Sequence, residues 1–140
     1  MTVLPEQPDA RAQRRGLRDA VAVLAEVATA GERGVLLGAL GTLDDALARH
    51  AQFAESPDGL FAEVIGATPR LAHQVKRLEA EHEALHEHID RCEAQLRVGA
   101  GVDDAIRADL ADLLRAFEMH VHRGVELVYD AYNVDISAGD

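Results

Sequence analysis

The sequence contains few aromatic residues. They make up 4% of the 140 positions, and tryptophan does not occur. The hydrophobic fraction is nevertheless 48%, so a core must be built from leucine, valine, alanine and isoleucine. Such residues suit closely packed helices better than a β-sandwich, and strand-like alternation is nowhere sustained. The composition therefore predicts an all-α protein.

Cysteine and long apolar runs are also scarce. The only cysteine, Cys92, cannot form an internal disulfide, which fits a reducing compartment. No apolar run approaches the roughly 20 residues needed to span a bilayer, and the first residues lack the pattern of a secretory signal. We therefore expect a cytoplasmic protein without membrane contact.

Basic residues are fewer than acidic residues. The formal net charge is −11, whereas a nucleic-acid-binding protein needs a basic patch to displace phosphate counterions. The ordinary explanation of such a charge is solubility. The balance predicts that nucleic acid is not a partner.

Apolar residues recur at helical spacing in four stretches. They predict helices over about residues 9–30, 32–54, 70–98 and 103–132 of one domain, with a loose lead over residues 1–8 and an irregular tail over 133–140. Pro57 must break or bulge the second helix, and residues 60–65 add a short apolar extension. Helices joined by short loops pack antiparallel. We therefore expect an up-down-up-down four-helix bundle.

The sequence has seven histidines, and helical phase sorts them. His50, His82 and His120 fall on the apolar stripes of the second, third and fourth helices, and His86 follows His82 on nearly the same face. The remaining three are expected to face solvent: His73, His88 and His122.

The height of the inward histidines along the bundle can be counted from the turns. At about 1.5 Å per residue, the levels of His50, His82 and His120 differ by roughly 3 Å at most. A single histidine on an apolar face is more often a satisfied core residue than a ligand. Several at one level predict a shared metal ion, because each buried imidazole needs partners and His-x-x-x-His is ligand spacing. The alternative is a polar layer linked by hydrogen bonds and water.

These motifs resemble the hemerythrin-like, or HHE cation-binding, family of four-helix bundles over roughly residues 10–132. The resemblance rests on Ala-Arg-His50, on Glu-His82-Glu-Ala-Leu-His86, and on His120 followed by Glu126-Leu-Val-Tyr. It implies two non-haem irons held between the helices, with dioxygen or nitric oxide as ligand.

The sequence departs from the family pattern at three places. Arg14 stands at the level where the first helix normally gives a histidine, and the expected carboxylates of the second and fourth helices are each displaced by one residue, to Glu55 and Glu126. A π-bulge could rotate both carboxylates inward. Alternatively Glu55 lies on the surface and Glu126 pairs with His122. The predicted metal ligands are His50, His82, His86, His120, Glu55 and Glu126.

Three functions follow as hypotheses. The first is a non-haem iron protein, with one or two irons and with zinc as the alternative metal, that binds or senses a small diatomic ligand. The second is a metal-free bundle acting as a scaffold, an interaction module or a homodimer. The third, a metal-dependent oxidase or peroxidase, lacks a nameable nucleophile or acid/base pair. Catalysis is therefore not predicted.

Overall fold

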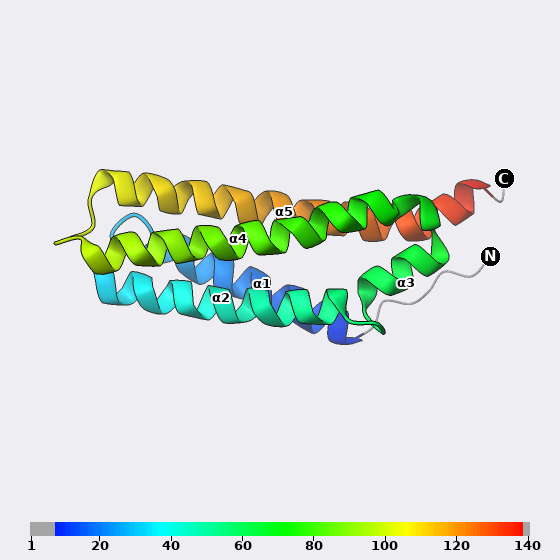
Figure 1. Ribbon diagram of the computed structural model, residues 1–140, viewed down its shortest axis with the longest axis horizontal. Helices are drawn as coiled ribbons and strands as arrows, with labels where there is room; N and C mark the ends of the chain where they lie inside the picture. Colours follow the sequence, from blue (N-terminus) through cyan, green and yellow to red (C-terminus); the bar gives the residue numbers. More distant parts are fainter. Residues whose placement is uncertain (1–7, 139–140) are drawn as a thin grey trace.

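The computed structural model describes the backbone of residues 8–138 and the side chains of residues 12 and 14–132. The described elements are α1 (Pro8–Val27), α2 (Arg33–Glu55), α3 (Leu60–Ala67), the 3-10 turn η1 (Pro69–Leu71), α4 (Ala72–Val98) and α5 (Asp104–Ala138). The long helices α1, α2, α4 and α5 form an antiparallel bundle in which each contacts its neighbours around the ring (Figure 1). The predicted all-α four-helix architecture is confirmed, and this part of the chain contains no strand.

The end of α5 differs from the prediction. The helix continues through residues 133–138, where the polar composition had suggested an irregular tail. Polarity does not end a helix by itself, because each added residue gains a backbone hydrogen bond, and the first glycine of this stretch is residue 139. The predicted lead falls mostly on residues outside the described range, and α1 already begins at Pro8.

The chain breaks after Glu55, as Pro57 predicted. Ser56 has extended backbone, and α3 starts again at Leu60. Gly59 is required between them, because a Cβ there would lie 2.2 Å from the carbonyl oxygen of Phe53. The break redirects the chain so that α3 closes one end of the bundle (Figure 1). Phe61 and Val64 of α3 are thereby buried.

The described side chains form two apolar core clusters with a polar layer between them. The larger cluster includes Leu47, Leu85 and Phe117, and the smaller one includes Leu78 and Leu127. Along α2, α4 and α5, a histidine stands between the residues of one cluster and those of the other: His50, His82 and His120 respectively. Packing on both sides therefore fixes the layer where these histidines lie.

Side chains tie the loops at the other end of the bundle. Arg107 donates to the carbonyl oxygens of Ala28 (2.9 Å) and Gly31 (3.3 Å) after α1. Arg33 donates to the carbonyl oxygen of Gly99. Orphaned carbonyls at helix ends are satisfied in this way, which holds the helices in register.

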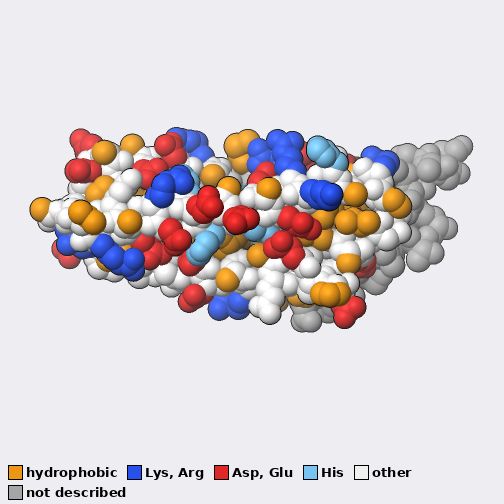
Figure 2. Space-filling model, in the orientation of Figure 1, with side chains coloured by type: hydrophobic (Ala, Val, Ile, Leu, Met, Phe, Trp, Pro, Cys, Tyr) orange, Lys and Arg blue, Asp and Glu red, His pale blue; other side chains and the backbone are white. Residues whose placement is uncertain are grey.

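Charged residues cover the outside of the bundle. Figure 2 shows one long face, where Asp and Glu side chains gather over α4. Among the described helices, none combines the length and the apolar character that crossing a bilayer requires.

Candidate metal centre

Three imidazole rings from three helices meet in the polar layer. The ring centroid of His82 lies 4.8 Å from that of His120 and 5.1 Å from that of His50, and the third separation is 5.7 Å. One nitrogen from each ring can be chosen so that all three lie within 4.8 Å of one another. His82 and His120 are buried and His50 is half-buried. The expectation that these rings share one level is met.

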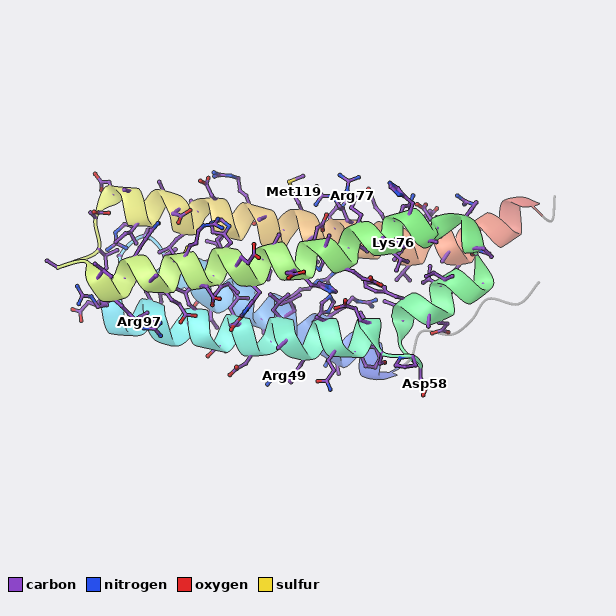
Figure 3. The ribbon with its side chains drawn as sticks, viewed as in Figure 1. Arg49, Asp58, Lys76, Arg77, Arg97 and Met119 are labelled. Atoms are coloured by element: carbon purple, nitrogen blue, oxygen red, sulfur yellow. The ribbon has the colours of Figure 1, made fainter. Side chains whose placement is uncertain are left out.

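The residues beside two of these histidines show how helical phase aims them. Arg49 and Met119, which directly precede His50 and His120, point out of the bundle (Figure 3), and Met119 is 55% exposed. Successive residues are rotated by about 100° around a helix. Each following histidine is therefore turned away from that outward direction, and its ring lies beside that of His82.

Carboxylates orient two of the rings. Nδ1 of His82 lies 3.0 Å from Oε2 of Glu55, and Nδ1 of His120 lies 2.8 Å from Oε1 of Glu81. An ionised carboxylate only accepts hydrogen bonds, so each Nδ1 carries the proton and donates it. In that tautomer the lone pair is on Nε2. Metal-binding histidines have this arrangement, in which a carboxylate on the second nitrogen fixes tautomer and ring orientation.

Glu81 is itself held in place. Nη1 of Arg123 lies 3.0 Å from Oε2 of Glu81, and Nε of Arg77 lies 4.0 Å from the same oxygen. The carboxylate thus joins His120 to two cations and is 20% exposed. Sequence reasoning assigned no role to Glu81. Glu81 directly precedes the predicted ligand His82, which was the available signal in the sequence. The ring that Glu81 contacts is that of His120, on the neighbouring helix α5.

A further feature of this layer is the Nε2 atom of His82. It is buried and has no hydrogen-bond partner among the described residues, and leaving such an atom unsatisfied costs about 1–3 kcal/mol. Phe61 covers the same ring, with centroids 5.8 Å apart and planes at 10°. The contact between Phe61 and His82 was not predicted from the sequence. It arises because the chain turns at Pro57 and brings α3 onto α4.

A small cavity opens beside the three rings. It is lined by His50, His82 and His120, by apolar side chains such as Leu17 and Leu127, and by Arg14. The cavity volume is about 30 Å³. A single water molecule needs a cavity of roughly 10–15 Å³ on the same measure. The cavity therefore has room for an ion or a small molecule next to the imidazoles.

The surroundings keep the rings neutral. Burial lowers the pKa of His50 to about 3, with further lowering by the charges of His82, His120 and Arg14. Burial, followed by the charge of His120, lowers the pKa of His82 to about 4. Burial also lowers the pKa of His120, against the opposing effect of the hydrogen bond that its Nδ1 donates to Glu81. Neutral imidazole is the form that binds metal ions.

Arg14 lies where the sequence level predicted. It lines the cavity on the side of α1, and its charge acts on His50. A cation at this point opposes a second ion in the cavity, because like charges repel strongly where water is excluded. The first helix therefore contributes charge to the site in place of an imidazole.

His86 does not join the three rings. Its side chain is 52% exposed, and Nδ1 lies 2.7 Å from Oδ1 of Asp44. The expectation that it faces inward was wrong, because four residues advance about 400° around a helix, and Leu85 and Ile89 occupy the interior of this turn. The Asp44 hydrogen bond raises the pKa of His86.

The displaced carboxylates lie outside the group of rings. Oε1 of Glu126 lies 2.8 Å from Nε2 of His122, and the Glu126 side chain is 61% exposed. Glu126 therefore pairs with His122 on the surface, which was the alternative to a π-bulge. Glu55, 37% exposed, contacts His82 through Nδ1. In the described chain, the set of mutually close ligand atoms at this layer comprises His50, His82 and His120, without a carboxylate.

Two of the three remaining histidines are exposed, as expected: His73 and His122. His88 is not. Its side chain is 14% exposed, and Nε2 lies 3.0 Å from Oδ1 of Asp109 on α5. The helical stripe of α4 is therefore wider than the sequence pattern indicated, because α5 packs along one of its sides.

Comparison with known proteins agrees with this arrangement. The model of the hemerythrin HHE cation binding domain matches residues 10–131, which includes all three clustered histidines. No curated protein and no solved structure matches the chain significantly. With the family model spanning most of its length, the chain belongs to the hemerythrin HHE cation-binding domain family.

Proposed function

We propose that this chain binds one transition-metal ion, with iron as the first candidate, through His50, His82 and His120. The observation that carries the proposal is the buried Nε2 of His82, to which no described residue forms a hydrogen bond. An ion held among the three rings would satisfy this nitrogen. It would draw on a donor set that is already neutral and, for two of the rings, already oriented by carboxylates.

The donor set indicates the kind of ion. Imidazole suits iron, zinc and copper, and three protein ligands leave at least one coordination position open. Iron(II) bound there would supply a centre at which dioxygen or nitric oxide can coordinate. The chain contributes the adjoining cavity, whose mostly apolar lining suits a small uncharged ligand.

One ion is favoured over the two of the family's usual centre. Bridging two ions requires carboxylates between them, and both candidates face other partners: Glu55 contacts His82, and Glu126 contacts His122. Arg14 further opposes the added positive charge of a second ion. The acidic surface around the bundle favours the approach of cations in general.

Metal analysis of the purified protein tests the proposal. After expression with added iron, we expect about one iron per chain by elemental analysis, together with a shift in the absorption spectrum when nitric oxide is added. Two irons per chain that are both lost in His82→Leu would contradict the single-ion site. No bound metal after loading with either iron or zinc would contradict the function itself.

Glu81→Gln tests the orienting role of the carboxylate. Loss of such a partner typically lowers metal affinity by about 10- to 100-fold, and we expect that range here because glutamine keeps the shape but removes the charge facing His120 and Arg123. Competitive titration against a chromogenic chelator measures it. Glu83→Gln, an exposed position on the same helix, is the matched control and should leave affinity unchanged. Equal affinity in both variants would show that Glu81 does not orient a ligand.

A metal-free interaction module is the second candidate, and Arg14 is the observation that favours it. Its charge in the cavity weakens cation binding. In that case chelator would leave the melting temperature of the purified protein unchanged.

A further inference from the structure

A second group of metal-ligating side chains lies between α4 and α5. His88 and Cys92 are one turn apart on α4, and Asp109 faces them from α5. Nε2 of His88 lies 3.0 Å from Oδ1 of Asp109, and Sγ of Cys92 lies 3.5 Å from Oδ2. One ligand atom from each residue can be chosen so that all three lie within 4.8 Å of one another.

This group is separate from the three clustered histidines. Along α4, Cys92 lies roughly 15 Å beyond His82, and along α5, Asp109 lies roughly 16 Å before His120, at about 1.5 Å per residue. The apolar layer that contains Leu85, Ile89 and Leu113 belongs to the intervening core. The same ion could not contact both groups.

The group is enclosed but reachable from outside. Cys92 is fully buried, whereas the His88 and Asp109 side chains are 14% and 25% exposed. His88 borders one surface hollow and Asp109 borders another, and Arg91 borders both. An ion can therefore enter from the surface while the sulfur lies at the inner end of the site.

The three donors suit a zinc-like ion. Thiolate, imidazole and carboxylate are the usual zinc ligands, with bonds of about 2.3, 2.0 and 2.0 Å. On a tetrahedral ion, those lengths place thiolate sulfur and carboxylate oxygen roughly 3.5 Å apart, close to the separation between Cys92 and Asp109. Cys92 and Asp109 would therefore need little rearrangement to close around an ion.

We infer that His88, Cys92 and Asp109 form a second metal site, for a divalent ion of the zinc type with water as the fourth ligand. Binding replaces the thiol proton of Cys92 with the metal–sulfur bond, and that proton leaves to solvent. The proton that Nε2 of His88 donates to Asp109 moves through solvent to Nδ1, which leaves the lone pair on Nε2 for the ion. The thiolate and the Asp109 carboxylate balance the two charges of the ion. The nearby Arg91 and Glu93 offset one another. In the metal-free protein, burial and Asp109 raise the pKa of Cys92 to about 12, which makes it an unreactive thiol.

Cobalt(II) is the probe, because a cobalt–thiolate bond gives intense charge-transfer absorption in the near ultraviolet. Cys92 is the only cysteine, so such a band reports this site alone. Titration of the chelator-stripped chain with cobalt should produce the band, saturating at one thiolate-bound cobalt per chain. Added zinc should remove it by competition. Absence of the band in the folded parent protein would overturn the inference.

Variants separate this site from the three-histidine site. Cys92→Ala should abolish the band, and Asp109→Asn and His88→Gln should each lower cobalt affinity at least about tenfold. If Cys92→Ala does not fold because Cys92 is buried, His88→Gln still tests the site. His82→Leu should leave the band intact, and Cys92→Ala should keep iron binding. A band that survives unchanged in both His88→Gln and Asp109→Asn would also overturn the assignment.

Discussion

Replacing His82 with leucine is expected to lower the affinity for iron by at least about 100-fold. The substitution removes one of three proposed ligands, and even the loss of a partner that merely orients a ligand typically costs about 10- to 100-fold. Competitive titration of iron(II) under anaerobic conditions measures this loss. His82 is the sharpest position to test because its Nε2 is buried and has no hydrogen-bond partner in the part of the chain that the structure describes.

The same substitution should stabilise the metal-free protein. Leucine removes a buried nitrogen whose unsatisfied state costs about 1–3 kcal/mol, and it adds apolar surface between Leu78 and Leu85 in the core. We expect the free energy of unfolding of the chelated protein to rise by about 1–2 kcal/mol, as urea denaturation would show. A gain in stability coupled to a loss of metal is typical of residues kept for function.

His86→Leu is the matched control for His82→Leu. It makes the same substitution one turn further along α4, at a side chain that is 52% exposed and bonded to Asp44. Iron affinity should not change. If His86→Leu lowered the affinity as much as His82→Leu, the three-histidine assignment would be wrong and the ligand would come from the outer face of α4.

Acidification should destabilise the metal-free protein between pH 6.5 and about 4. In the folded state the pKa of His50 is lowered to about 3 and that of His82 to about 4, whereas an unfolded histidine titrates near 6.5. Above pH 6.5 both states hold neutral rings and stability is complete. Below it only the unfolded chain takes up protons, so stability is lost as the pH falls toward the folded-state pKa. The loss should be on the order of 3 kcal/mol at pH 5.

Urea denaturation of the chelated protein from pH 7.5 to pH 5 measures this slope. His120, whose pKa burial also lowers, contributes with the same sign. The raised pKa of the exposed His86 adds stability at low pH, and so does the raised pKa of Glu55, while Asp109, whose pKa is lowered, acts only below this window. His82→Leu should therefore show a clearly shallower dependence than the parent chain. Identical slopes in the two proteins would contradict neutral burial of His82.

The same residues explain the pH dependence expected of the metal-bound form. Protons and the ion compete for the same nitrogens, so metal affinity falls as the pH drops. For His50 and His82, however, the lowered pKa weakens this competition, because the rings stay neutral well below pH 6 without the ion. Burial thus prepares the site for an ion at the expense of acid stability.

The sequence by itself determined the helical fold and the level at which three histidines meet. Both depend on quantities that are local to a helix. Apolar spacing selects the inward face, and a constant rise per residue converts a count from each turn into a height. For this reason His50, His82 and His120 could be brought together without coordinates, and Pro57 could be identified as a break.

Only the tertiary structure decided what each side chain contacts across helices. Glu81 reaches His120, Phe61 covers His82, and Asp109 faces Cys92, all over gaps between elements whose relative rotation the periodicity does not specify. The rotation also left His86 outside and His88 inside, although both lie within about 60° of the helical stripe. A helix determines its own faces, but its neighbours determine which of them become interior, because packing acts between elements and not along one.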